Sequence, residues 1–259
     1  MSLTPVGLGA RAARGGSGVG RARVELSVDT VAGAVAADSL GVRRIELCSA
    51  GALGGLTPGP GLLATVLARC RRTEVHVLVR PREGGFDYRP AEVDAMAADV
   101  AHAVAAGAAG VVVGALGGDG DPDRGAVAEM VAAAAGRPVC FHRALDVCRD
   151  PLAAVDLLAG WGVHRVLSSG HEVRAEDGAG VLAAMVRVAG DRLAVTACGG
   201  IRAHNAAALL RATGVAEVHA APRRPGVSAR IAGRAVDFGG HAEFDLAAAA
   251  ELVAAVRAG

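Results

Sequence analysis

Short runs of β-branched and other apolar residues alternate along the chain with longer stretches that have a helical period. The runs cover residues 22–28, 43–48, 74–80, 110–115, 138–143, 164–169, 192–197 and 216–221. The longer stretches, rich in Ala, Leu and Val and bounded by Gly, Pro, Asn or Asp, lie near 29–40, 60–71, 90–106, 123–135, 150–160, 178–189, 203–213 and 245–257. Short strands that alternate with helices in this way predict a parallel sheet.

Eight consecutive strand–helix units predict an α/β fold, a (β/α)₈ TIM barrel that forms a single domain over residues 22–259. The 259 residues of the chain are enough for one such barrel. An open doubly wound sheet is the alternative, but its first strand usually runs into a Gly-rich fingerprint, and the first strand here runs into VDTVAGA. Residues 1–21 contain scattered Arg and no continuous apolar segment, which predicts a flexible N-terminal tail rather than a secretory signal.

Composition excludes several classes of function. The formal net charge is only +1 and aromatic residues make up 2% of the chain, which argues against nucleic acid or a membrane surface as a partner. All 27 basic residues are Arg, so chemistry that needs a Schiff-base lysine or a P-loop lysine is excluded. The five cysteines are an odd number and form no CxxC pair, which is typical of free thiols in a reducing cytoplasm.

Polar and ionisable residues gather at one end of the predicted strands. Side chains alternate along a strand, and the functional groups of a TIM barrel collect at the carboxyl ends of its strands. The candidates on the strands and in the loops that follow them are Glu46, Cys48, Arg80, Arg82, His142, Arg143, Asp146, Ser168, Ser169 and His219. A structural network, in which Glu25, Glu46 and Glu217 pair with Arg or His across the barrel, is the other interpretation of these residues.

The candidate residues are typical of a small charged pocket. Three arginines indicate affinity for an anion: Arg80, Arg82 and Arg143. His142, together with Glu46 or Asp146, would supply general acid–base catalysis. The Gly199–Gly200 pair opens the helix after the seventh strand, where free backbone N–H groups would suit a phosphate or a carboxylate.

Six motifs, in order and spread along the chain, resemble those of the CutC copper homeostasis proteins. They are IELCSA followed by GGLTPGPGLL, then RPR, VVGALGGDG, FHRALDV, RVLSSG and a Gly-Gly-Ile turn. The resemblance covers about residues 22 to 257 and implies a cytoplasmic (β/α)₈ barrel that forms a homo-oligomer, is linked to copper tolerance and binds Cu(I).

The resemblance also implies roles for particular residues. The cysteine after Ile-Glu-Leu matches Cys48, which makes it the candidate copper ligand. The family pattern has a cysteine in its first strand where this chain has Ser27, and Cys or Ser often follows the position of His219, where this chain has Ala220. Because Cu(I) prefers two or three soft ligands, weaker Cu(I) binding than in relatives with the extra cysteine is expected.

Three functional hypotheses therefore remain open at the level of sequence. The first is a cytoplasmic copper homeostasis protein that binds Cu(I) through Cys48 and one other soft ligand. The second is an enzyme that acts on a small phosphorylated or carboxylated metabolite, which is favoured by the Arg, His and carboxylate residues. The third is a binding scaffold without chemistry, because no nucleophile can be identified.

Overall fold

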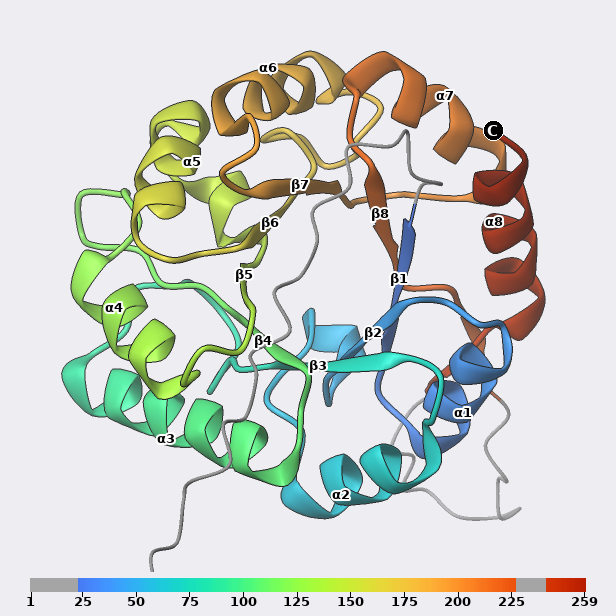
Figure 1. Cartoon of the computed structure of the whole chain (residues 1–259), viewed down its shortest axis with the longest axis horizontal. Coiled ribbons are helices and arrows are strands. Elements are labelled where there is room, and N and C mark those ends of the chain that lie inside the picture. Colours follow the sequence, from blue (N-terminus) through green and yellow to red (C-terminus); the bar gives the residue numbers. More distant parts are fainter. Residues whose placement is uncertain (1–22, 227–240) are drawn as a thin grey trace, which may run out of the picture.

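A computed structural model describes residues 23–226 and 241–259, so the tail predicted for residues 1–21 lies outside the described residues. Eight parallel strands form a closed barrel in the order of the sequence, which confirms the predicted TIM-barrel fold (Figure 1). The strands are β1 (Arg23–Val28), β2 (Arg44–Leu47), β3 (Glu74–Leu78), β4 (Gly110–Val113), β5 (Val139–Phe141), β6 (Arg165–Ser168), β7 (Ala194–Ala197) and β8 (Glu217–Ala220).

Within the described residues, eight α-helices surround the barrel, one after each barrel strand (Figure 1). Several begin at a side chain that accepts a hydrogen bond from a backbone N–H of the first turn, namely Thr30, Asp123, Asp150 and Asp245, as expected for N-cap residues. Their bounds are α1 (Val31–Ser39), α2 (Pro60–Arg69), α3 (Pro90–Ala106), α4 (Arg124–Ala133), α5 (Pro151–Gly160), α6 (Ala179–Ala189), α7 (Ala203–Thr213) and α8 (Leu246–Ala258).

The alternation of side chains along the strands separates two apolar regions. The larger core lies between the strands and the helices and contains residues such as Leu26, Ile45 and Phe141. A smaller cluster of the opposite parity consists of Cys48, Leu78, Val112, Cys140, Leu167 and Cys198. We call this smaller group the inner cluster. It fills part of the barrel interior with small and medium side chains, as expected for a packed TIM barrel.

Buried charges occupy the part of the barrel interior near the amino ends of the strands. Arg44 begins β2, Arg165 begins β6 and Glu217 begins β8, and all three pair within the barrel with one another or with Glu25 of β1. The Arg165–Glu25 distance is 2.7 Å and the Arg44–Glu217 distance is 3.1 Å. The structural network considered from the sequence is therefore present for Glu25 and Glu217.

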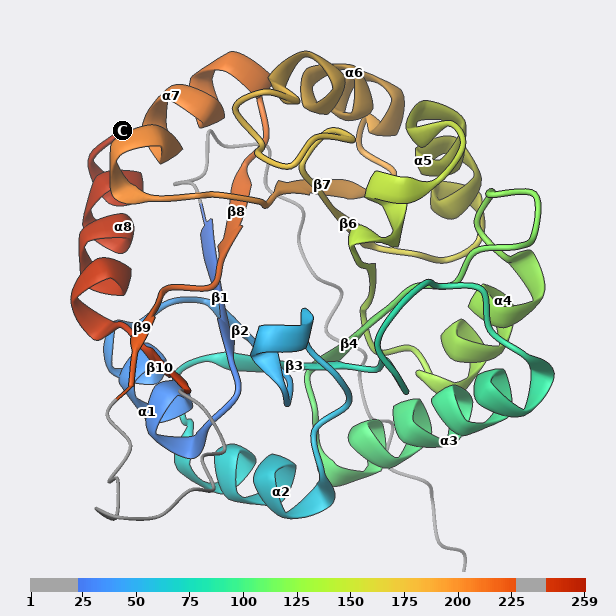
Figure 2. The same cartoon turned by 180° about the vertical axis from the view of Figure 1, so that it is seen from behind.

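Two connections shape the carboxyl ends of the strands. The connection after β2 contains a short 3₁₀ turn, Gly51–Leu53, which lies over the barrel opening in the view of Figure 2. The connection after β8 contains two short antiparallel strands, β9 (Arg223–Pro225) and β10 (Ala242–Phe244), on either side of residues outside the described ranges. The carboxyl ends of the strands therefore open into a mouth that has loops around it.

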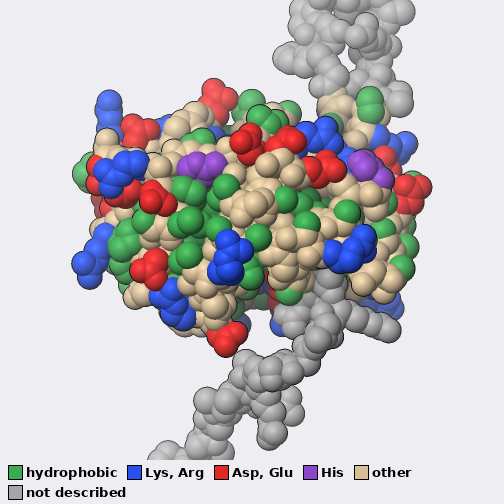
Figure 3. Space-filling model, turned by 90° about the horizontal axis from the view of Figure 1, so that it is seen from above, with side chains coloured by type: hydrophobic (Ala, Val, Ile, Leu, Met, Phe, Trp, Pro, Cys, Tyr) green, Lys and Arg blue, Asp and Glu red, His purple; other side chains and the backbone are tan. Residues whose placement is uncertain are grey.

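The exterior carries both signs of charge. On the face drawn in Figure 3, Arg side chains and carboxylates are interspersed over the described residues. Within the described ranges, no helix combines the length and the apolar character needed to cross a membrane.

Candidate functional site

A cavity of about 550 Å³ opens at the carboxyl ends of the strands. We call it the mouth cavity. Of the residues predicted from the sequence, it brings together Glu46, Cys48, Arg80, His142, Arg143, Asp146, Gly199, Gly200 and His219. Residues that the sequence analysis did not select also line it, among them Ser27, Phe86, Arg202 and Arg223. Its position at the strand ends is the usual place for a TIM-barrel site.

Arg82 does not line the mouth cavity, although the sequence suggested it as an anion ligand. Its guanidinium donates to the Glu92 carboxylate over 2.5 Å and to the backbone oxygens of Gly85 and Asp87. It also lies 4.9 Å from the centroid of the Tyr88 ring. Arg82 therefore holds the loop that precedes α3 and lies outside the residues that line the mouth cavity.

Ser168 and Ser169 are buried beside the mouth cavity rather than exposed to it. Their hydroxyls donate to the Asp146 carboxylate over 2.6 and 2.9 Å, and the Ser169 backbone N–H donates to it as well. Arg143 Nε donates to the same carboxylate over 2.6 Å. Both oxygens of Asp146 thus accept several hydrogen bonds, and this carboxylate fixes the loop after β5 against the loop after β6.

Arg80 is buried in the wall of the mouth cavity, with 8% of its surface exposed. Its Nη1 donates to the backbone oxygens of Leu53 and Gly55 over 2.9 and 3.1 Å, and its Nη2 donates to that of Gly84 over 3.0 Å. Its Nε has no partner among the described residues. Within those residues no carboxylate neutralises this guanidinium, because all three hydrogen bonds go to carbonyl groups.

His142 is a neutral side chain in the wall of the mouth cavity, where it packs against the same Phe86 ring as Arg80. Its Nδ1 accepts a hydrogen bond from the Ala144 backbone N–H over 3.0 Å, so the neutral ring carries its proton on Nε2. Burial, together with the nearby Arg80 charge, lowers the pKa of His142 to about 3. The Nε2 atom is buried and has no partner in the described part of the chain. In this tautomer the N–H group of His142 is at Nε2, and Nδ1 is already occupied by the Ala144 N–H.

We expect two buried histidines to make the protein less stable in acid. Burial lowers the pKa of both His76 and His142 to about 3, whereas an unfolded histidine titrates near pH 6.5. The unfolded state therefore binds more protons between pH 6.5 and 3, so the free energy of unfolding falls as the pH falls through this range. Each histidine contributes a slope of up to about 1.4 kcal/mol per pH unit.

Urea unfolding at pH 7, 5.5 and 4 measures this slope. The variant His76→Gln is expected to have a shallower slope than the wild type, whereas the same change at the exposed His204 should leave it unaltered. An equal slope in all three proteins would show that His76 is not buried in its neutral form.

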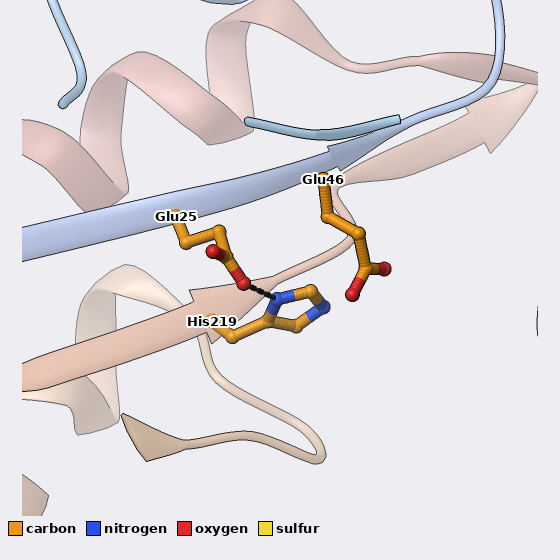
Figure 4. Close-up of side chains that lie close together, drawn as sticks. All are labelled: Glu25, Glu46 and His219. Atoms are coloured by element: carbon orange, nitrogen blue, oxygen red, sulfur yellow. Dashed lines mark hydrogen bonds and ion pairs between the residues drawn. The ribbon is translucent and has the colours of Figure 1, made fainter. Parts of the chain in front are cut away.

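Three ionisable side chains meet at the β8, β1 and β2 side of the mouth cavity (Figure 4). His219 lies between Glu25 and Glu46, and its Nδ1 is 2.7 Å from Glu25 Oε1. Burial opposes a charge on His219, but Glu46 and the hydrogen bond to Glu25 raise its pKa. Burial raises the pKa of Glu46. Glu46 therefore takes up a proton more readily than an exposed carboxylate, and His219 holds its proton more strongly than an exposed histidine.

The ligand atoms of Glu25, Glu46 and His219 lie within 4.8 Å of one another, a spacing that could hold a metal ion. The hydrogen bonds of Glu25 oppose this use. Its Oε1 pairs with His219, and its Oε2 is 2.7 Å from Arg165 and 3.4 Å from Arg44. These cations lower the pKa of Glu25 although burial raises it. The two guanidinium groups already neutralise the Glu25 carboxylate and would repel a divalent cation, so this cluster is better suited to proton transfer.

Cys48 is almost fully buried where the inner cluster meets the mouth cavity. Its Sγ lies 3.8 Å from Ser27 Oγ and 3.6 Å from the backbone oxygen of Val28. Burial raises the pKa of Cys48 to about 12, and it does the same for Cys140. Both are therefore neutral thiols at pH 7, and the partner of Cys48 on β1 is a hydroxyl, as the motif in the first strand implied.

Two arginines of the mouth cavity could not be predicted from the alternation of side chains along the barrel strands. Arg202 lies in the loop between β7 and α7 and is exposed, and within the described residues its Nη1 donates to the backbone oxygen of Ile201. Arg223 begins β9, and its Nη1 donates to Asp29. Both lie in the connections that follow a barrel strand, where the parity of the barrel strands no longer applies, and the signal in the sequence was their position shortly after a predicted strand.

The fold and the mouth cavity define a TIM-barrel protein with a polar cavity at the carboxyl ends of its strands. The model of the CutC family matches residues 22–223. A CutC family protein of Xanthomonas campestris pv. campestris is 41% identical over 208 residues, which are 80% of this chain and 86% of that protein. One from Photobacterium profundum is 39% identical over 197 residues, which are 76% and 80% of the two chains. The chain belongs to the CutC family.

A solved structure supports the same assignment. It is described as a copper homeostasis protein, CutC, from Streptococcus agalactiae, and it superimposes with a TM-score of 0.72 at 28% identity. The match covers 76% of this chain and 97% of the Streptococcus protein. The family resemblance inferred from the sequence motifs is confirmed.

Proposed function

We propose that the mouth cavity binds a small organic anion, a phosphorylated or carboxylated metabolite. The observation that carries this proposal is the buried guanidinium of Arg80, whose hydrogen bonds within the described residues all go to carbonyl groups. A charge that is removed from water and has no counter-ion is unfavourable. An anion in the cavity would supply the missing counter-charge.

Groups that can contact the anion directly lie around the same cavity. Arg143, Arg202 and Arg223 each line it and each use only part of their five donors on the described residues. The Gly199–Gly200 turn lies just before α7, and the backbone conformation of both residues, with φ of 91° and 74°, favours glycine. Guanidinium groups bind phosphate and carboxylate well because they donate two parallel hydrogen bonds.

The cavity also has groups for acid–base chemistry. Glu46 and His219 line it; burial raises the pKa of Glu46, and the carboxylates of Glu46 and Glu25 raise the pKa of His219, so both groups can take up or release a proton during a reaction. This feature favours an enzyme over a binding scaffold. The sequence suggested acid–base catalysis for His142 and Asp146. We now propose that His142 donates a hydrogen bond to the ligand and that Asp146 positions the loops.

A ligand screen tests the proposal. Thermal unfolding is measured with a panel of phosphorylated and carboxylated metabolites, and with the neutral alcohols of the same carbon skeletons as controls. At one hundred times its dissociation constant, a bound anion adds about 2.7 kcal/mol to the free energy of unfolding, which is several degrees of melting temperature. Equal melting temperatures with the anions and with the neutral controls would contradict the proposal.

Copper is a second candidate ligand, favoured by the description of the Streptococcus protein as a copper homeostasis protein. The residues of this chain fit Cu(I) poorly. Cu(I) is best held by thiolates, but Cys48 is a neutral thiol whose neighbour on β1 is the Ser27 hydroxyl. The other thiols of the inner cluster, Cys140 and Cys198, are also buried, and burial raises the pKa of each. We therefore derive no chemistry through copper.

We expect Ser27→Cys to strengthen Cu(I) binding at least ten-fold, because it would place a second thiol about 4 Å from that of Cys48. Cys48→Ala is expected to remove most of the binding that the wild type has. The measurement is a competition titration against a Cu(I)-specific chelator under strict reduction. Equal affinity in the wild type and in Cys48→Ala would show that this thiol is not a ligand.

The family resemblance further suggests a homo-oligomer in the cytoplasm. Sedimentation velocity at micromolar concentration tests the assembly, and fractionation of cells that express the protein tests its location. A monomer, or a protein found outside the cytoplasm, would contradict the respective suggestion.

A further inference from the structure

His142 places one unused hydrogen-bond donor at the wall of the mouth cavity. The neutral ring has its proton on Nε2, because Nδ1 accepts from the Ala144 N–H. A buried donor without a partner costs free energy, and native structures usually provide one. In the described part of the chain Nε2 has none, although the residue lines the cavity. A hydrogen-bond acceptor on a ligand would provide the missing partner of this N–H group.

The His142 ring is held in one orientation. On one side it packs on Gly114, where an added Cβ would come within 2.3 Å of the ring Cε1 and 2.4 Å of Nδ1. On another side the Phe86 ring lies 4.9 Å away, measured between centroids. Only glycine leaves room for the ring at position 114. This fixed donor is neutral, so it can polarise a carbonyl oxygen without losing its proton.

The proton-exchanging residues lie across the barrel from His142. Glu46 lies on β2, His219 on β8 and Glu25 on β1, whereas His142 directly follows β5. In the closed order of eight strands, β5 is four places from β1 in either direction. A molecule in the mouth cavity therefore lies between a fixed N–H donor on one side and the carboxylate of Glu46 on the other.

We propose that the anion bound in the mouth cavity carries a carbonyl group, and that the protein transfers a proton at the carbon next to it. This inference rests on the proposed function and names its substrate class: a carboxylated or phosphorylated aldehyde or ketone. The Glu46 carboxylate takes the proton as the C–H bond breaks. The electron pair of that bond forms the C=C bond of an enolate, and its oxygen accepts the hydrogen bond from His142 Nε2.

The proton then returns from Glu46 to the same carbon or, where that carbon carries a hydroxyl group whose own proton passes to the enolate oxygen, to the former carbonyl carbon. The first outcome regenerates the substrate and the second gives an isomer, so no oxidant, reductant or co-reactant is consumed. His219, whose Nδ1 is bonded to Glu25, lies within 4.8 Å of the Glu46 carboxylate, so a positive charge on this ring favours the carboxylate form of the base. Carbonyl chemistry through a lysine imine is excluded because the chain contains no Lys.

Matched pairs of anions that differ only in the carbonyl group test the inference. The probes are 2-oxobutyrate against 2-hydroxybutyrate and dihydroxyacetone phosphate against glycerol 3-phosphate. Titration calorimetry should show that the carbonyl member of at least one pair binds about ten-fold more tightly, the effect of one hydrogen bond. In deuterium oxide, proton NMR should show loss of the signal from the C–H group next to that carbonyl, faster than without protein.

Variants separate the two roles. His142→Phe should abolish the preference for the carbonyl member without weakening the hydroxyl member, whereas His142→Gln, which keeps an N–H donor, should retain part of it. Glu46→Gln should retain the preference and stop the exchange. Arg82→Ala, which lies outside the cavity, should match the wild type in both measurements.

The outcomes distinguish this inference from the proposed function. Equal affinity for both members of each pair, without exchange, would overturn the carbonyl inference while anion binding stands. Carbonyl preference that survives in His142→Phe would show that His142 is not the donor to the carbonyl oxygen. If no member of either pair binds and the wider anion panel also fails, both the proposed function and the inference are wrong.

Discussion

Replacing Arg80 by glutamine is expected to weaken binding of an anion in the mouth cavity by roughly thirty-fold or more. The guanidinium is buried and has no carboxylate partner among the described residues, so its charge acts on the ligand with little screening. Two charges about 4–8 Å apart interact by roughly 2–4 kcal/mol at an effective dielectric constant of about 20. Titration calorimetry with the tightest anion from the screen measures the loss.

Two further variants separate the charge of Arg80 from its contacts with the loops. Arg80→Lys keeps the charge, so it should bind the anion better than Arg80→Gln. Neither variant can donate to Leu53, Gly55 and Gly84 together, so both should melt at a lower temperature than the wild type. Arg82→Ala removes a nearby arginine that contacts Glu92 outside the cavity and should leave the affinity unchanged. If Arg80→Gln binds as tightly as Arg82→Ala, Arg80 has no electrostatic role in binding.

Replacing Arg165 by methionine is expected to lower the free energy of unfolding by about 3–5 kcal/mol. Arg165 is 2.7 Å from Glu25, and the two side chains are 6% and 0% exposed. The substitution leaves a buried carboxylate with fewer counter-charges, and its charge is costly in this position. Urea unfolding at pH 7, followed by circular dichroism, measures the change.

A surface pair provides the matched control for Arg165. Arg192 and Asp156 are 2.8 Å apart, but their side chains are 52% and 62% exposed, so Arg192→Met should cost less than about 1 kcal/mol. The double variant Arg165→Met/Glu25→Gln should recover part of the loss, because it removes both buried charges. A cost at Arg165 as small as that at Arg192 would show that the buried network contributes little to stability.

The fold could be predicted from the sequence because periodicity is a local property. Each strand and each helix of the described barrel lies within a few residues of its predicted position, and glycines or cap residues such as Asp123 and Asp150 stand at the ends. The parity of a strand also predicted which side chains face inward. Glu46 and Cys48 of one strand, and His142 and His219 of two others, all line the mouth cavity for this reason.

The roles of individual residues could not be predicted in the same way. Arg80 and Arg82 are two residues apart in one motif, but Arg80 lies in the cavity wall and Arg82 binds Glu92 outside it. Parity ends where a strand ends, and beyond that point the loop conformation decides where a side chain lies. Ser168 and Ser169 likewise followed a strand, and in the structure they bind Asp146 beside the cavity.

The sequence by itself determined the barrel, the inward set of polar residues, the absence of lysine chemistry and the family, because these depend on residue types and on spacing along the chain. Only the tertiary structure decided which charges neutralise one another. Glu25 has arginine partners from two other strands, whereas the Arg80 guanidinium donates its hydrogen bonds within the described residues to carbonyl groups. Only the tertiary structure decided that His142 is a neutral donor, because its tautomer and pKa depend on burial and on contacts between segments distant in sequence.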